Sequence, residues 1–174
     1  DEAVPGFALP EDIKSLLKRL PDDPEKYIKK KYEEACKDQF VVKQYARFID
    51  VIYRNEAGAV LWHCGSGKDR TGLGTALLLL LLGAEEETIM QDYMRTNEYL
   101  AGELQYMQRL TQTWEDIPRG ADRKLAALYQ VKEEYLETAF MAIKKEYGTQ
   151  ERFFRNGLYL KPKMISELKD KYLI

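Results

Sequence analysis

Residues 59–82 read AVLWHCGSGKDRTGLGTALLLLLL and contain three successive patterns that decide the fold. The short apolar run at 59–63 follows a glycine and is typical of a buried strand. Small and charged residues fill positions 64–70. Residues 71–82 are almost entirely apolar up to Gly83, which is expected to end a helix. The stretch therefore predicts a strand, a loop and a buried helix in that order.

The rest of the chain shows helical periodicity. Apolar residues spaced by three and four positions predict an amphipathic helix at 13–20, and Asp22 and Asp23 then offer an N-cap to the next helix. Further helices are expected at 27–52, 85–95, 98–110, 122–147, 149–155 and 162–172, with Gly148 as a C-cap. One strand cannot make a sheet, so either weak strands escape the pattern or the other strands belong to sequence outside this chain.

Composition limits the classes of partner. The chain has 174 residues, 45% of them hydrophobic and 32% charged, which predicts one domain over 1–174. The formal charge of -2 gives no reason to expect nucleic acid or an anionic membrane as the main partner. The apolar run at 76–82 is too short to span a bilayer. Two cysteines and one histidine cannot build a usual zinc site, so neither a metal nor another cofactor is expected.

Cys64 and Arg70 lie six positions apart in the loop between the expected strand and helix. The spacing alone is weak evidence, but Gly65 and Gly67 allow a tight loop whose backbone N–H groups point inward. This loop and the helix N-terminus behind it would cradle a phosphate and lower the pKa of the Cys64 thiol. Arg70 can hold two phosphoryl oxygens through its planar fork, and Thr71 can donate its hydroxyl to the sulfur.

Residues 60–72, VLWHCGSGKDRTG, resemble the signature of cysteine-dependent phosphatases of the protein tyrosine phosphatase superfamily. They are most similar to the bacterial branch whose loop reads H-C-x-x-G-K-D-R-T-G, a group of tyrosine and phosphoinositide phosphatases similar to the mycobacterial B-type enzyme. The resemblance implies an α/β fold with a central sheet flanked by helices. It also implies that Cys64 is the nucleophile and Arg70 the phosphate-binding arginine. The backbone donors implied for the phosphate-binding loop are Gly65, Ser66, Gly67, Lys68 and Asp69.

The sequence departs from the family in the region ahead of the signature. Family members carry further strands there and a carboxylate often assigned as general acid, and nothing in this chain aligns with that region. We therefore expect a phosphatase-like domain that lacks an N-terminal portion, and association with that missing fragment is one expected partnership. The favoured proton donor is Asp69, which could equally be a structural partner of Lys68 or an orienter of the loop. Asp22 and Asp23 fit capping better than catalysis.

Three nearby side chains have open or secondary roles. His63 either orients the loop and supports the thiolate or is a core histidine. Lys68 is expected to add positive charge at the mouth of the site, which would suit polyanionic head groups. Cys36 reads as a buried bystander. A nucleotide-binding Walker loop is excluded because Asp69 follows Gly67 and Lys68 where serine or threonine is required.

The sequence thus predicts a phosphomonoester hydrolase that works through a cysteinyl-phosphate intermediate. A protein tyrosine or dual-specificity phosphatase is favoured, with a phosphorylated protein as substrate. A phosphoinositide or inositol-phosphate phosphatase is the alternative within the same chemistry. The alternative from another class is a non-catalytic fragment that binds phosphoanions. The compartment, cytoplasmic or secreted, stays undecided.

Overall fold

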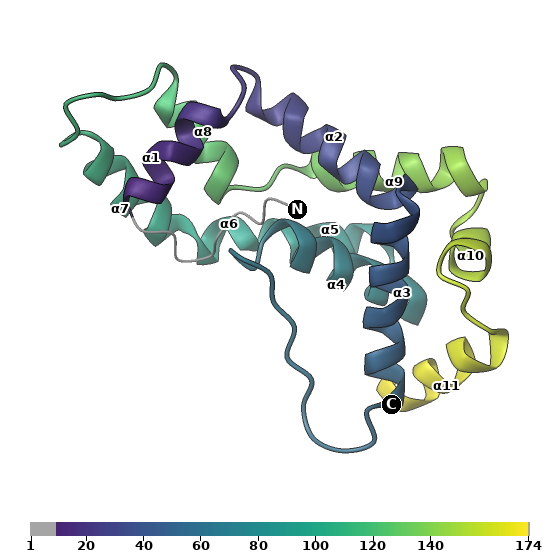
Figure 1. Cartoon of the computed structure of the whole chain (residues 1–174). Helices are drawn as coiled ribbons and strands as arrows, with labels where there is room; N and C mark the ends of the chain where they lie inside the picture. The colour runs from purple at the N-terminus through teal and green to yellow at the C-terminus, as the bar shows by residue number, and fades with distance from the viewer. Residues whose placement is uncertain (1–9, 174) are drawn as a thin grey trace.

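The computed structural model describes residues 10–173, and regular secondary structure over that range is helical (Figure 1). The elements are α1 (Pro10–Arg19), α2 (Pro24–Lys37), α3 (Gln39–Arg54), α4 (Asp69–Leu82), α5 (Glu86–Met94), α6 (Thr96–Tyr99), α7 (Ala101–Thr111), α8 (Ala121–Tyr129), α9 (Glu133–Tyr147), α10 (Gln150–Arg152), the π-helical turn η1 (Phe153–Gly157) and α11 (Pro162–Tyr172).

The predicted sheet is wrong for residues 10–173, none of which is in a strand. Residues 59–63, expected to form a buried strand, are extended but make no backbone–backbone hydrogen bond to the described chain. Leu61 at the centre of this run is 89% exposed. The physical reason is the lack of a second extended segment, because a strand is stable only when its N–H and C=O groups pair. Figure 1 shows the run within an open arc between α3 and α4.

One side chain ties this arc to the helices. The Trp62 indole N–H donates to Oγ1 of Thr75 on α4 at 3.1 Å, and its ring meets Phe48 of α3 edge-on with centroids 5.5 Å apart. The ring pair and the hydrogen bond each stabilise the contact by about 1 kcal/mol. The arc is therefore anchored next to the loop that it leads into, although its middle lies in solvent.

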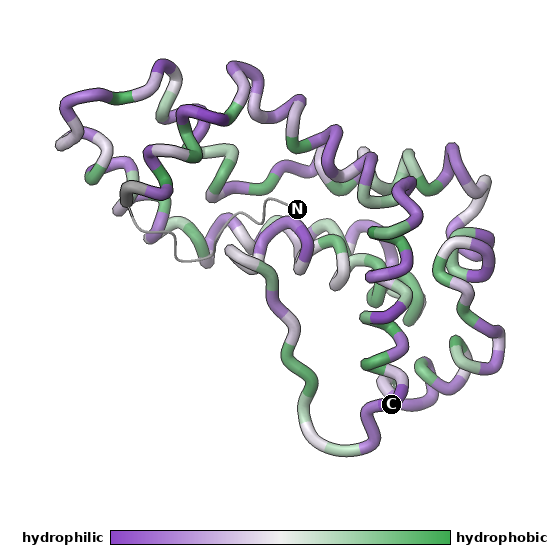
Figure 2. Tube along the Cα trace, in the orientation of Figure 1, coloured by the Kyte–Doolittle hydropathy of each residue, from purple (hydrophilic) through white to green (hydrophobic). Residues whose placement is uncertain are grey.

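The main core surrounds α4. Leucines fill this helix, and Leu73, Leu77 and Leu81 are each at most 2% exposed. Helices α2, α3, α5, α9 and α11 and the turn η1 supply most of the other buried residues of the cluster, and the connecting segments supply Val131, Leu158 and Leu160. Figure 2 shows the apolar residues of α4 in the middle of the molecule and a separate apolar stretch on the exposed arc. As the sequence predicts, α4 ends at Gly83, whose φ of 98° is readily adopted by glycine.

A second, smaller core joins α1, α7 and α8. Ile13 and Leu17 on α1 are buried against Leu104, Met107 and Leu125. This confirms the amphipathic helix expected at 13–20. Helix α8 carries part of the second core and α9 carries part of the main core, and α2 runs alongside α9 in Figure 1.

Two expected long helices are each broken once. The stretch 27–52 turns at Asp38, whose carboxylate accepts hydrogen bonds from the N–H groups of Phe40 and Val41 and caps α3. The stretch 122–147 is interrupted at 130–132. There the Asn97 side chain accepts from Val131 N–H at 2.7 Å and donates to Val131 C=O at 3.1 Å. This amide replaces the helical hydrogen bonds of Val131, so tertiary contacts override the local helical pattern.

None of the helices described between residues 10 and 173 has the length and apolar character needed to cross a membrane.

Candidate active site

The loop at 64–68 leads from the extended arc into α4, whose first residue is Asp69. Gly67 has a φ of 65°, a left-handed conformation that strains any residue with a Cβ atom. No side chain caps the N-terminus of α4. The first N–H groups of the helix therefore have no capping side chain as acceptor and face the loop, which is the arrangement that binds anions.

The Cys64 thiol lies within this ring of donors. Its partial burial raises the pKa, but hydrogen bonds to the sulfur oppose this effect and leave the pKa below its ordinary value. The donors are the hydroxyl and N–H of Thr71 and the N–H groups of Lys68 and Gly67. A thiol with a lowered pKa carries a larger fraction of thiolate, the nucleophilic form, at neutral pH. Cys36 is the opposite case, because burial in α2 raises its pKa to about 12.

The Thr71 hydroxyl lies near that sulfur and contributes to the lowered pKa of the thiol. Its oxygen is buried and has no hydrogen-bond partner within the described chain. A hydroxyl donor beside Cys64 favours the negatively charged form of the thiol. The expected role of Thr71, to stabilise the sulfur when it becomes a leaving group, stays a prediction.

Lys68 occupies a different position from the one expected. Its side chain is 1% exposed, so its ammonium does not lie at the mouth of the site. Nζ donates to the carbonyl oxygens of Ala127 at 2.7 Å and Gln130 at 3.1 Å. It also lies 3.4 Å from Oδ2 of Asp69. The side chain of Lys68 therefore links the loop to the C-terminal end of α8.

Asp69 is held through both carboxylate oxygens. The Tyr32 hydroxyl donates to Oδ1 at 3.0 Å, and Lys68 lies near Oδ2. The Tyr32 hydroxyl is also 2.6 Å from the hydroxyl of Tyr93 on α5. Sequence periodicity placed these tyrosines on helices but gave no sign that they meet Asp69. Only the packing of α2, α4 and α5 brings the three side chains together.

The other predicted site residues are exposed or partly buried. Arg70 is exposed in the first turn of α4, where its carbonyl accepts from the Tyr45 hydroxyl at 3.4 Å. His63 is exposed, with Nδ1 3.1 Å from the carbonyl oxygen of Cys64. This contact suits the loop-orienting role better than that of a core histidine. Gly65 and Ser66 are partly buried.

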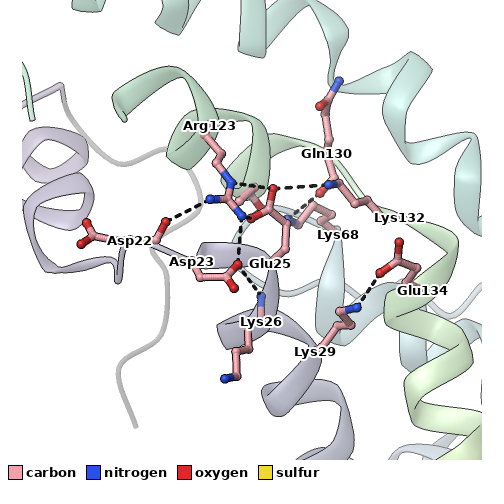
Figure 3. A network of polar contacts seen from close by, with 11 residues as sticks. Asp22, Asp23, Glu25, Lys26, Lys29, Lys68, Arg123, Gln130, Lys132 and Glu134 are labelled. Atoms are coloured by element: carbon pink, nitrogen blue, oxygen red, sulfur yellow. Dashed lines mark hydrogen bonds and ion pairs between the residues drawn. The ribbon is translucent and has the colours of Figure 1, made fainter. Parts of the chain in front are cut away.

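The other candidate proton donors belong to a separate network (Figure 3). Asp23 caps α2 by accepting from Lys26 N–H, as predicted, and its carboxylate also binds Arg123 at 3.0 Å. The backbone carbonyl of Asp22 accepts from the same guanidinium. Figure 3 shows the Asp23 carboxylate and the Asp22 backbone carbonyl facing Arg123, and the Asp22 carboxylate pointing away from it. Capping and ion pairing therefore account for Asp23, and Asp22 contributes its backbone carbonyl.

No three His, Cys, Asp or Glu side chains converge as a metal site within the described chain. The donors near the loop are backbone N–H groups, the Thr71 hydroxyl and, on the first turn of α4, the guanidinium of Arg70. Such donors suit an anion rather than a cation.

Comparison with known proteins agrees with this chemistry. A model of the tyrosine phosphatase family matches residues 9–174. A protein of Cupriavidus necator named "Putative tyrosine-protein phosphatase" is 29% identical over 135 residues, 77% of this chain and 47% of that protein. The "Triple specificity protein phosphatase PtpB" of Mycobacterium tuberculosis is 33% identical over 111 residues, 56% of this chain and 38% of that protein.

A "Tyrosine-protein phosphatase" of Nostoc commune is 40% identical over 60 residues, 34% of this chain and 20% of that protein. In all three pairs the matched region covers less than half the length of the relative.

Proposed function

Because this chain belongs to the tyrosine phosphatase family, we propose that it hydrolyses phosphomonoesters by covalent catalysis, with Cys64 as nucleophile and Arg70 as phosphate ligand. The observation that carries the proposal is the lowered pKa of Cys64, caused by the N–H groups of Gly67, Lys68 and Thr71 and the Thr71 hydroxyl around the sulfur. Those donors would serve equally well for the oxygens of a bound phosphate. One loop can thus bind the substrate and activate the thiol.

In the first step the thiolate attacks phosphorus in line with the ester oxygen. An S–P bond forms, the P–O ester bond breaks, and the departing oxygen takes up a proton from a general acid or from solvent to become a hydroxyl. The Arg70 fork and the N–H groups of 65–69 bind the three non-bridging oxygens, whose charge is spread in the transition state. Arg70 is exposed in the first turn of α4, which leaves its guanidinium accessible to a phosphate entering from solvent.

In the second step a water molecule attacks the phosphoenzyme. An O–P bond forms, the S–P bond breaks, the water gives up a proton to a general base or to solvent, and the sulfur leaves with the electron pair as a thiolate. The Thr71 hydroxyl, which contributes to the lowered pKa of this thiol, is placed to donate to the departing thiolate. Inorganic phosphate is released and the enzyme returns to its starting state.

Asp69 was the favoured proton donor from the sequence, and that role stays a prediction. The contacts to Tyr32 and Lys68 support the orienting role that the sequence left open, because both oxygens already have donors. A carboxylate held in this way fixes the N-terminus of α4 relative to α2. Substitution of Asp69 distinguishes the two roles, as set out in the Discussion.

Hydrolysis of p-nitrophenyl phosphate by the purified chain tests the proposal. We expect Cys64→Ser and Arg70→Ala to abolish turnover, and Cys36→Ala to retain it as a matched cysteine control. Mass spectrometry of acid-quenched enzyme should find phosphate on the peptide that contains Cys64. Turnover that survives Cys64→Ser would overturn the covalent mechanism, and absence of turnover and of phosphoenzyme in the wild-type chain would overturn the activity.

Within this chemistry we favour phosphotyrosine or dual-specificity substrates over phosphoinositides. The supporting observation is the burial of Lys68. Its ammonium donates to the carbonyl oxygens of Ala127 and Gln130 and is therefore not exposed to a polyanionic head group. Rates on a phosphotyrosine peptide, a phosphoserine peptide and a soluble phosphoinositide decide the point. A higher kcat/KM on the phosphoinositide would reverse this preference.

One observation favours the alternative of a phosphoanion-binding fragment that needs a further polypeptide. Residues 59–63 leave their backbone groups unpaired with the described chain, and Leu61 is 89% exposed. Native mass spectrometry of the purified material tests this alternative. A second, non-covalently bound chain together with an inactive isolated chain would favour it, and an active chain on its own would exclude it.

A further inference from the structure

Three consecutive residues between α8 and α9 receive contacts from three other parts of the molecule. Gln130 accepts a hydrogen bond from Lys68 of the loop, and Val131 is bound through both backbone groups by Asn97 of α6. Lys132 pairs with Glu25 of α2 at 3.3 Å. We refer to residues 130–132 as the junction. Loop, α6 and α2 are therefore all fixed to one short extended segment.

The contact with Lys68 suits the chemistry of a helix C-terminus. Ala127 lies in the last turn of α8 and Gln130 is its C-cap, so their carbonyl oxygens are among those left without helical partners. A cation is favoured at this end of the helix dipole. The charged groups that act on the buried ammonium are Asp69 and Cys64. The ammonium thus satisfies the end of α8 and holds the backbone of the loop at the same time.

Asn97 completes the arrangement from the other side. Its amide makes two hydrogen bonds to Val131, at 2.7 and 3.1 Å, which fix the extended backbone of the junction. The Gln130 carbonyl that receives Lys68 belongs to the adjacent residue. The position of that carbonyl therefore depends on Asn97, although Asn97 is neutral and has no hydrogen bond to the loop.

We propose that Lys68 and Asn97 are positioning residues for the phosphate-binding loop, and that they act through the junction rather than by contact with substrate. The inference rests on the proposed function, because it assigns a purpose to the shape of the same loop. It differs from the expectation of a substrate-facing lysine. Loss of either side chain should loosen the loop amides that converge on Cys64.

The chain supplies a matched control for Lys68. Lys124 is also a buried lysine, 6% exposed, whose Nζ donates to a carbonyl oxygen, that of Leu17, at 3.2 Å. It lies on α8 and links that helix to α1 without reaching the loop. Lys68→Met and Lys124→Met therefore make the same chemical change. The first removes a buried ammonium that binds the C-terminal end of α8, and the second removes one that belongs to α8 itself. Asn55, whose amide donates to the Gly58 carbonyl, gives the corresponding control for Asn97.

The readout is the rate at which iodoacetamide alkylates Cys64 as a function of pH, measured on the full chain by peptide mass spectrometry. For Lys68→Met we expect the midpoint of the curve to move toward that of a free thiol, with a rate near pH 6 about tenfold below wild type, the change produced by a shift of one pKa unit. Asn97→Ala should shift the curve in the same direction. Lys124→Met and Asn55→Ala should leave the midpoint unchanged.

Each other outcome has a definite meaning. A shift with Lys68→Met but none with Asn97→Ala would show that Lys68 acts through its charge alone, which overturns the positioning role of the junction. Equal curves for Lys68→Met and Lys124→Met would overturn it too, as would a selective rise in KM for a phosphoinositide with an unchanged alkylation curve. If Lys68→Met does not fold, the comparison of Asn97→Ala with Asn55→Ala decides alone. Because alkylation needs no turnover, an inactive wild-type chain would overturn the proposed function and leave this test readable.

Discussion

The hydroxyl of Tyr32 lies 3.0 Å from Oδ1 of Asp69, and this contact joins the middle of α2 to the first residue of α4. The hydroxyl is buried and also lies 2.6 Å from that of Tyr93. Burial first, then the nearby charge of Asp69, raises the pKa of Tyr32 well above its ordinary value. Tyr32 is therefore a neutral donor that orients a carboxylate next to the loop at 64–68.

Replacement of Tyr32 by phenylalanine should lower both stability and turnover. The variant leaves a buried hydroxyl of Tyr93 and an oxygen of Asp69 without this partner, which costs about 1–3 kcal/mol. The free energy of unfolding in urea and kcat on p-nitrophenyl phosphate measure the two effects. Tyr53→Phe removes a 2.7 Å hydrogen bond to Glu167 far from the loop and should leave kcat unchanged. Equal kcat values for the two variants would contradict the orienting role of Tyr32.

Asp69→Asn separates an orienter from a proton donor. A general acid contributes about 10²–10⁴ to the rate, and its loss matters most when the leaving group is poor. With Asp69 bound by Tyr32 and Lys68, we expect kcat to fall by a similar factor for p-nitrophenyl phosphate and for phenyl phosphate. A loss confined to phenyl phosphate would instead identify Asp69 as the acid. The pH profile of each reaction gives a second measure of the same difference.

Gly72→Ala should destabilise the chain although alanine favours helices. A Cβ atom at Gly72 would lie 2.9 Å from the ring of Tyr93, closer than real contacts allow. Overpacking of this kind costs about 1–3 kcal/mol and outweighs the gain of about 1 kcal/mol in helix propensity. At Gly102 on α7 nothing lies within 4 Å, so Gly102→Ala should be neutral or stabilising. Thermal melting of both variants tests the opposite signs.

Stability should fall with acid through the titration of Glu25. Burial alone would raise its pKa, but hydrogen bonds from Arg123, its own backbone N–H and Lys132 lower the pKa to about 2. A lowered folded-state pKa adds stability that is present above the ordinary value of 4.5 and is lost as the pH falls toward 2. Urea unfolding at several pH values across that window measures the loss. Glu25→Gln should flatten the curve there, and an unchanged curve would contradict the assignment.

Local sequence chemistry predicted the features that depend on neighbouring residues. Gly83 and Gly148 end helices, and Asp23 caps one, because the cost of a left-handed residue or an unpaired N–H is local. The lowered pKa of Cys64 also follows from a short loop in front of a helix. Each of these features depends on contacts within a few positions along the chain.

Features set by distant contacts could not be predicted in the same way. The break at 130–132 contains no glycine or proline, and it exists because Asn97 binds Val131 from another helix. The Lys68 side chain reaches the carbonyl oxygens at the C-terminal end of α8, and its position therefore depends on where that helix ends. Tyr32 reaches Asp69 only because α2 packs beside the start of α4. The prediction of a sheet was wrong because an apolar run forms a strand only when another strand pairs with it.

The exposure of Leu61 has a consequence for handling the protein. A segment without backbone–backbone hydrogen bonds to residues 10–173, and with a leucine that is 89% exposed, fits readily into the cleft of a chymotrypsin-like protease. Cleavage there would divide the chain between α3 and α4 while both pieces stay together through the packing of α2 against α9. Digestion of the folded protein should thus give two fragments on a denaturing gel and a single species in gel filtration.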